Sequence, residues 1–181
     1  MPHRPDLNGL SPQERQTLVN LMLQYLTDKI VVIGHTDINH HGEDLFIGHR
    51  KYIEGMESFL SSNGGGQFVP LPKWDPANPI PAEFNVVKPQ DDGTARPALV
   101  NLNPQRILPS EYKCPELSQG FDTLQSLAIS INPWHGGAHN AIGGTMADPV
   151  IAPAAPIFWC YHGFLDEIYY DWENGCNATN S

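Results

Sequence analysis

The sequence has few basic residues and no long apolar run. Ten lysine and arginine residues stand against twenty aspartate and glutamate residues, so the formal net charge is −10 and the pI is about 5.0. Nucleic-acid binding needs basic patches that meet phosphates, so we expect no nucleic-acid partner.

No stretch approaches the roughly 18 apolar residues of a membrane span. The start, MPHRPDLNG, lacks the apolar core of a secretory signal. We therefore expect no membrane partner and favour a cytoplasmic location, although a signal removed earlier leaves no trace.

The sequence is also poor in cysteine. Its three cysteines cannot all pair within one chain, and none stands in a Cys-x-x-Cys pair, so a thiolate zinc site is not expected. Cys160 lies in the apolar run PIFWCYHGF, where we expect a buried thiol. A disulfide between Cys114 and Cys176 is one alternative for the other two, and two free thiols are the second.

What the chain does contain predicts one mainly helical domain over residues 1–181. This length is enough to bury a substantial core. The first helix is expected to open with a capping box at Ser11 and Glu14 and a proline at its first position. Apolar residues at helical period predict helices at 11–30, about 44–59, 120–131 and 156–175, and a short one that holds His135 and His139.

Proline and glycine gather between these helices. Residues 63–120 hold much of the proline, and only short strands or turns fit there. A structureless stretch of this length is unusual in a compact domain. Either the segment wraps over a helical core or part of it is mobile. Its aromatic residues Phe68, Trp74 and Phe84 favour wrapping.

Seven of the eight histidines form two groups, separated by 85 residues without a histidine. The groups are His35, His40, His41 and His49, and then His135, His139 and His162. Each group could supply three ligands to one metal. Three imidazoles with an open position suit copper or zinc, whereas carboxylates would be expected for magnesium or calcium.

The spacing within each group supports a shared metal. His135 and His139 stand four apart in WHGGAHNAIGG, and histidines at this spacing lie on one face of a helix. The alternative for this pair is two histidines in a glycine-rich loop. His40 is nine residues before His49, so it would reach a metal from the turn that leads into the second helix. His35 is expected at the end of the first helical region.

Several motifs, in the right order from about Ser11 to Trp172, resemble those of tyrosinases and catechol oxidases. HHGEDLFIGHRKYIEGMESF is similar to the family's first copper motif, with its histidine, aromatic position, His-Arg and glutamate at His40, Phe46, His49–Arg50 and Glu57. HGGAHNAIGGTM followed by PIFWCYHGFLDEIYYDW is similar to the second, with the matching positions His135, His139, Gly143–Gly144, Met146, Pro156, Phe158–Trp159, His162 and Asp166. LPKWDP is similar to the Pro-Tyr-Trp-Asp segment, with lysine in place of tyrosine.

The resemblance implies an antiparallel four-helix bundle core that holds a dicopper site, with long Pro/Gly-rich loops around it. Two copper ions would react with dioxygen. Carried over by position, the ligands of the first copper are His35, His40 and His49, and those of the second are His135, His139 and His162. The family's spacing varies at His35, and His41 competes with His40, which the nine-residue spacing favours.

Other residues are expected around the ligands. Arg50 follows one ligand and Asp166 comes one helical turn after another, so the two form either a buried pair that clamps the helices or two solvated charges. Their apolar surroundings favour the pair. The rim of the pocket is expected from the segment after His139 and near Gly136, with Asn140, Met146, Pro149 and Val150 as candidates.

The chain departs from the family pattern at several positions. Many tyrosinases that hydroxylate monophenols have asparagine where Gly136 stands, and no acid lies near the matching upstream position, which is Leu127. A base is needed because a phenol must bind copper as phenolate, so catechol oxidation is favoured. Tyr161 replaces the first histidine of the family's His-His pair. For its side chain, packing in the core is favoured over the alternative, a place in the lining of the pocket. Ala155 stands where aspartate is usual, and no C-terminal shielding domain is expected.

The leading functional hypothesis is an oxidase that converts o-diphenols to o-quinones with dioxygen. Hydroxylation of monophenols and oxidation of o-aminophenols are the alternatives within the same class. A reversible dioxygen-binding copper protein and a zinc or decayed site are alternatives outside it. The expected partners are a small phenolic substrate and dioxygen, and homo-oligomers are left open by the sequence.

Overall fold

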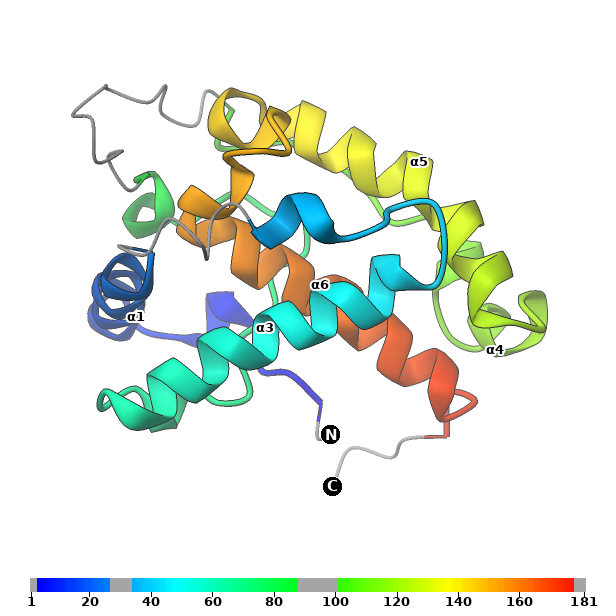
Figure 1. The fold of residues 1–181 in the computed structure, drawn as a ribbon, viewed down its shortest axis with the longest axis horizontal. Coiled ribbons are helices and arrows are strands. Elements are labelled where there is room, and N and C mark those ends of the chain that lie inside the picture. Colours follow the sequence, from blue (N-terminus) through cyan, green and yellow to red (C-terminus); the bar gives the residue numbers. More distant parts are fainter. Residues whose placement is uncertain (1–2, 27–33, 88–100, 178–181) are drawn as a thin grey trace.

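The computed structural model describes residues 3–26, 34–87 and 101–177. In these ranges the α-helices are α1 (Pro12–Tyr25), α3 (Asp44–Ser62), α4 (Glu116–Gly120), α5 (Leu124–Ile142) and α6 (Pro156–Glu173) (Figure 1). Short 3-10 helices connect them, and extended pairing in the described residues is limited to one bridge between Asp6 and Lys73. The mainly helical class predicted from the sequence is confirmed.

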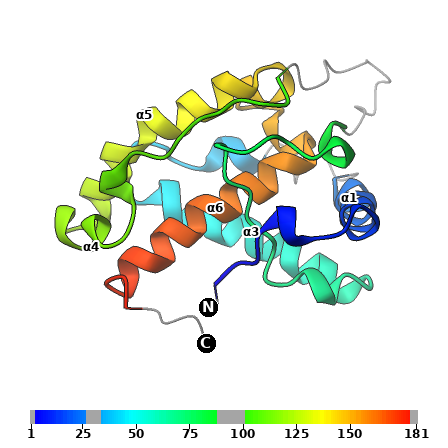
Figure 2. The same ribbon diagram turned by 180° about the vertical axis from the view of Figure 1, so that it is seen from behind.

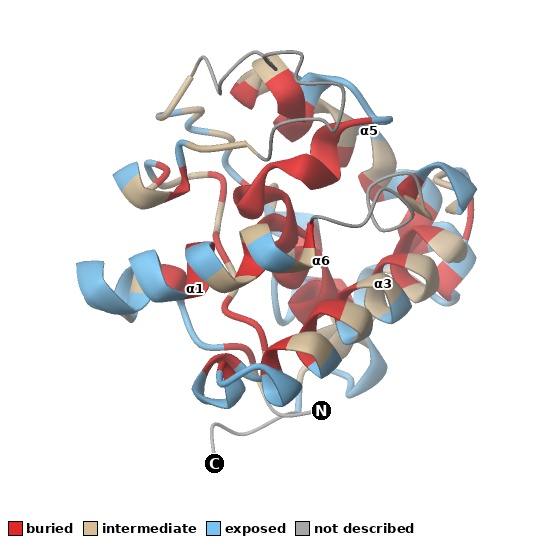
Figure 3. Cartoon of the chain, turned by 60° about the vertical axis from the view of Figure 1, so that its left-hand side comes forward, coloured by how far each residue is buried: buried red, intermediate tan, exposed pale blue. Residues whose placement is uncertain are grey.

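Helix α6 lies at the centre of the core. Between Pro156 and Tyr169 every residue except Phe164 is buried, as expected for a helix packed among others. Helices α3 and α5 lie beside it and run in the opposite direction, while α1 is seen end on at one edge (Figures 1 and 2). Their inward faces are buried and their outward faces exposed (Figure 3). This arrangement confirms the expected helical bundle core.

Helix α1 begins where the sequence predicts. The Ser11 hydroxyl accepts a hydrogen bond from the Glu14 backbone N–H, and the Glu14 carboxylate accepts one from the Ser11 backbone N–H at 2.8 Å. Two otherwise unpaired donors at the helix start are satisfied in this way. The last part of the predicted helix, at 27–30, lies outside the described residues.

Two predicted boundaries were wrong. Helix α5 is one continuous helix of 19 residues, where a break before His135 was expected, and Pro133 lies inside it. Proline removes one helical hydrogen bond, but Ile131 and Trp134 on either side are buried, and this packing holds the helix together. His35 does not end the first helix: it lies in a separate 3-10 helix, Gly34–Asp37.

The proline-rich segment wraps over the core in the residues that are described. Phe68, Trp74 and Phe84 are at most 1% exposed, and the Trp74 backbone N–H donates to the Cys160 carbonyl on α6 at 2.9 Å. Residues 88–100 of this segment lie outside the described residues. Among the helices described, none is both long and apolar enough to cross a membrane.

Cys114 and Cys176 form a disulfide, which decides between the two alternatives left by the sequence. The third cysteine, Cys160, is a buried free thiol as expected. Disulfides persist in oxidising compartments and are rare in the cytosol. The cytoplasmic location favoured from the sequence stays a prediction.

Candidate metal centre

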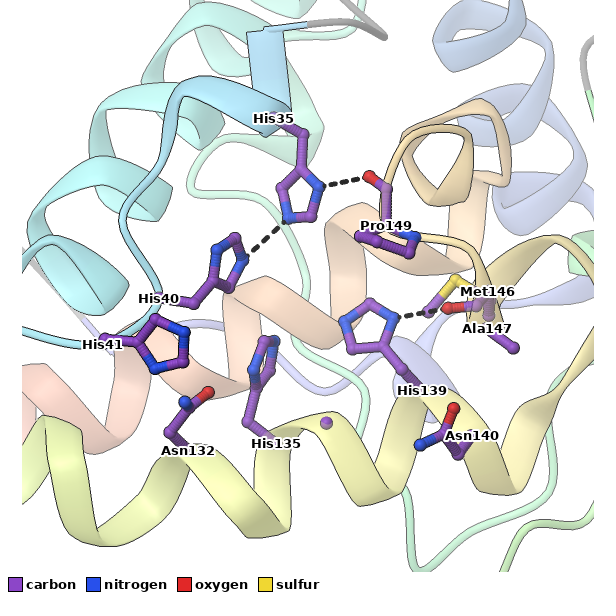
Figure 4. Close-up of a pocket in the computed structure, with 11 residues that line it drawn as sticks. His35, His40, His41, Asn132, His135, His139, Asn140, Met146, Ala147 and Pro149 are labelled. Carbon is purple, nitrogen blue, oxygen red and sulfur yellow. Dashed lines mark hydrogen bonds between the residues drawn. The ribbon is translucent and has the colours of Figure 1, made fainter.

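Six histidines from five parts of the chain meet in the interior of the bundle. They come from the 3-10 helix at Gly34–Asp37, the turn before α3, and helices α3, α5 and α6 (Figure 4). Five are buried and one is half-buried; the six are His35, His40, His49, His135, His139 and His162. Every histidine predicted as a ligand therefore lies in one cluster, although the members are up to 127 positions apart in the sequence.

His40 belongs to this cluster and His41 does not. The His40 ring lies with its Nε2 atom 3.1 Å from Nε2 of His35, whereas His41 is exposed at the edge of the neighbouring cavity. Figure 4 shows the His40 ring next to His35 and the His41 ring on the side of Asn132. This geometry agrees with the choice that the nine-residue spacing to His49 favours.

Backbone carbonyls set the tautomer of the ring in most of these histidines. The Nδ1 atoms of His49 and His162 each lie 2.6–2.8 Å from the carbonyl oxygen one helical turn earlier, that of Leu45 or Phe158. The same contact, at 2.7–2.8 Å, joins Nδ1 to a carbonyl oxygen in three other rings, those of His35, His40 and His139. A carbonyl oxygen can only accept, so Nδ1 carries the proton and Nε2 keeps a free lone pair in a neutral ring.

The Nε2 atoms with these lone pairs converge. Nε2 of His35 lies 3.1 Å from Nε2 of His49, and also 3.1 Å from Nε2 of His40. Two acceptors cannot form a hydrogen bond with each other, so a cation between them is needed to make this contact favourable. With metal–nitrogen bonds of about 2.0 Å, nitrogen atoms at this separation subtend roughly 100° at one metal.

The second group has a similar geometry. It differs from the prediction in that His49, expected with the first group only, also lies close to its ligand atoms. Nε2 of His135 lies 3.2 Å from Nε2 of His162, and ligand atoms of His49, His135 and His162 fall within 4.8 Å of one another. His49 therefore lies between the two groups, with its ring stacked on that of His162 at 4.1 Å. His139 lies against the same group, 4.8 Å from His135 between ring centroids, and its Nε2 is buried without a hydrogen-bond partner.

Burial keeps these histidines uncharged. It lowers the pKa of His35 and of His139 to about 4, and it holds the pKa of His49, His135 and His162 well below 6.5. A metal binds the neutral imidazole. Neutral rings with inward lone pairs, including one with no partner, fit a histidine-bound metal site, and copper is among the metals that imidazole suits.

These pKa values predict a strong pH dependence of stability for the metal-free protein. In the unfolded chain a histidine takes up a proton below about pH 6.5, whereas His35 and His139 stay neutral in the fold down to about pH 4. The unfolded state binds more protons in this window, so the free energy of unfolding should fall by several kcal/mol as the pH drops from about 6.5 to about 4. Urea unfolding across this range measures it.

A matched variant identifies the source of the pH dependence. His35→Gln removes one of the contributing groups and should flatten the curve. A free energy of unfolding that is constant between about pH 4 and about pH 6.5 in the metal-free protein would contradict the prediction.

Arg50 and Asp166 form the pair that was favoured over two solvated charges. Nε of Arg50 donates to Oδ1 of Asp166 at 2.5 Å and joins α3 to α6, one turn beyond His162. The Arg50 guanidinium also lies over the ring of Tyr169, at 3.9 Å from the ring centroid. The burial of Asp166, 5% exposed, makes this contact part of the core rather than the surface.

A second arginine in this network was missed by the sequence analysis. Arg4 is 3% exposed and donates to Asp166 at 2.9 Å, to Glu57 at 2.6 Å and to the Leu71 carbonyl at 3.0 Å. Its Nη2 atom also lies 2.7 Å from the Asp166 carboxylate as an ion pair. The backbone N–H of Leu71 also donates to Glu57 at 2.8 Å. Arg4 thus joins the N-terminal segment to α3 through Glu57 and to α6 through Asp166.

Tyr161 packs behind the histidines, which was the favoured alternative. It is fully buried, its ring is stacked on that of His135, and its hydroxyl donates to the His135 carbonyl at 3.0 Å. It does not line the cavity. The tyrosine therefore supports the backbone and ring of one predicted ligand without lining the cavity.

A cavity of about 280 Å³ opens beside the histidines (Figure 4). Of the predicted rim residues, it is lined by Gly136, Asn140, Met146 and Pro149. Val150 is half exposed and lies outside the lining. The lining also contains His41, Asn132 and Ala147, which were not predicted for it. Asn132 could have been found from its place one helical turn before Gly136 on α5.

Comparisons with known proteins agree with this centre. Residues 99–175 match the family model of the common central domain of tyrosinase, which covers the second histidine group and Asp166 but not the first group. The chain is similar to the N-acetyl-6-hydroxytryptophan oxidase of Emericella nidulans, with 38% identity over 45 residues. That match spans 25% of this chain and 12% of the relative. No solved structure matches the chain.

Proposed function

We propose that this chain is a member of the tyrosinase family and a dicopper oxidase that converts o-diphenols to o-quinones with dioxygen, which the match to the tyrosinase central domain and the similar oxidase support. The observation that carries the proposal is the meeting of neutral, buried imidazoles whose Nε2 lone pairs point at one another. We assign one copper to His35, His40 and His49, and the other to His135, His139 and His162. His49, which lies between the groups, is assigned to the first because its Nε2 contacts that of His35.

In the proposed reaction, two o-diphenol molecules and one dioxygen give two o-quinones and two waters. When bound, copper supplies the exchange of electrons between the diphenol and dioxygen. The protein holds the ligands in place through carbonyls that fix their tautomers, and it excludes water from all but one side of the cluster. That side is the cavity, where a flat ring can approach His40, His135 and His139.

The lining of the cavity favours diphenols over monophenols. A monophenol must lose its proton to a base before it binds copper. Among the described residues that line the cavity, none is an aspartate or glutamate, and a Cβ at Gly136 would meet nothing within 4 Å. The space that an asparagine would fill in many hydroxylating relatives is therefore open here. An o-aminophenol would fit the same cavity.

A second candidate substrate comes from the similar protein of Emericella nidulans, whose name gives a hydroxylated indole with an acetylated side chain as its substrate. A hydroxyindole is a flat phenolic ring, and a cavity of about 280 Å³ has room for it. A reversible dioxygen carrier fits less well, because a carrier needs phenols kept out and this cavity admits them.

The proposal is tested by oxygen uptake of the copper-loaded protein with catechol and with phenol. We expect prompt uptake with catechol, and uptake with phenol slower by about 10²-fold, the low end of what a missing base costs. A hydroxyindole is the third substrate. Equal rates with catechol and phenol would show a tyrosinase with another base. No uptake with any of the three would overturn the oxidase proposal and favour a carrier.

A further inference from the structure

The cavity is larger than one aromatic ring requires. Benzene is held by a cavity of about 150 Å³, whereas the cavity beside the histidines measures about 280 Å³. A substrate ring that reaches the histidines therefore leaves space for a ring substituent. The chemistry of that space decides which substituent is bound.

A row on one face of α5 lines this space. Asn132, Gly136 and Asn140 follow one another at four-residue spacing, so they lie on one face of the helix. The absence of a side chain at Gly136 leaves a gap between the two amides, since a Cβ there would meet nothing within 4 Å. Figure 4 shows Asn132 on the His41 side of the cavity and Asn140 on the side of Ala147.

The polar groups of this row are unused within the described part of the chain. Neither Asn132 nor Asn140 makes a side-chain hydrogen bond there, and the contact of His41 with Asn39 uses the backbone N–H of His41. Each carboxamide offers two donors and an acceptor. These groups are therefore available to a ligand.

The same space has no charged side chain. None of the described residues that line the cavity is a lysine, arginine, aspartate or glutamate. A carboxylate in the substituent would meet no lysine or arginine among these residues, in a protein whose formal net charge is −10. A neutral amide, which both donates and accepts, is matched by the two carboxamides.

We propose that Asn132 and Asn140 form an amide-binding rim, and that the substrates are phenolic rings whose side chain carries a neutral amide. This inference rests on the proposed oxidase function for the ring chemistry. Asn132 and Asn140 are specificity-determining residues, which bind the substituent and do not touch the reacting oxygens. Gly136 lets the substituent pass between them.

The first test compares three catechols that differ only in their substituent: N-acetyldopamine, dihydrocaffeic acid and methylcatechol. We expect kcat/KM of the copper-loaded protein to be about tenfold higher for N-acetyldopamine than for the other two. In Asn132→Leu that preference should fall to about twofold or less. The control is Asn20→Leu on α1, the same change at an exposed helix position outside the cavity lining, which should keep the full preference. Equal kcat/KM for the three catechols, or a preference that survives Asn132→Leu and Asn140→Leu together, would overturn the rim.

The second test measures binding without turnover. Calorimetry of the copper-loaded protein with N-acetylphenethylamine and with phenylpropionate, neither of which can be oxidised to a quinone, should give about tenfold tighter binding of the amide. Asn132→Leu should remove the difference. If the catechols are not oxidised while the amide still binds more tightly, the oxidase proposal fails and the rim stands. If the catechols are oxidised while both ring ligands bind equally, the rim fails and the oxidase proposal stands.

Discussion

Replacing His49 with alanine should release most of the copper and lower catechol-dependent oxygen uptake by at least about 10²-fold, more than the loss of an outer-shell partner. His49 lies between the two histidine groups: its Nε2 is 3.1 Å from that of His35, and its ring stacks on that of His162. The side chain is buried, so no water or other side chain from the surface can replace it. Copper per chain after dialysis, measured by atomic absorption, and oxygen uptake check the prediction.

His41→Ala is the matched control for copper content. His41 is adjacent to His40 in the sequence, but it is exposed and is not among the histidines whose ligand atoms converge. Copper bound to this variant should equal that of the unaltered protein, and the far-UV circular dichroism of both variants should be unchanged. Loss of copper from His41→Ala with retention in His40→Ala would reverse the choice between these two histidines. Full copper retention in His49→Ala would refute its place as a ligand.

The parts of the fold that could be predicted depend on interactions between near neighbours in the chain. The capping box at Ser11 and Glu14 and the wide apolar face of α6 are local patterns, and both elements appear where they were expected. The break predicted before His135 was wrong because it relied on a local signal, the proline at 133. Helix α5 stays continuous at this proline because distant parts of the chain pack against it.

The candidate site shows the same division. Histidine is uncommon enough that its spacing identifies the cluster. The family motifs around His49 and His162 also predict the nearby residues Arg50 and Asp166. Arg4 could not be found in this way, because its partners Glu57 and Asp166 lie 53 and 162 positions away. Asn132 was missed for another reason: it becomes part of the cavity only because α5 continues unbroken through Pro133 to the histidines.

Replacing Arg4 with methionine should lower the free energy of unfolding by about 3–5 kcal/mol, the cost of breaking a buried ion pair by removing one partner. The substitution leaves Glu57 buried with the Leu71 backbone N–H as its remaining partner, and Asp166 with Arg50 alone. Methionine keeps the apolar bulk of the side chain, so the change is mainly the loss of charge. For a chain of this size the midpoint of thermal unfolding should fall by roughly 6–20 °C.

Arg15→Met is the matched control, because Arg15 also pairs with a glutamate, Glu83, across two elements. That pair is closer to solvent, with 17% and 16% of the side chains exposed and a distance of 3.2 Å. Its loss should cost about 1 kcal/mol or less.

Because Arg4 also holds Asp166 one turn beyond His162, Arg4→Met and Asp166→Ala should both lose copper faster on dialysis than Arg15→Met. Equal midpoints and equal copper retention in Arg4→Met and Arg15→Met would mean that the buried network supports neither the fold nor the metal centre.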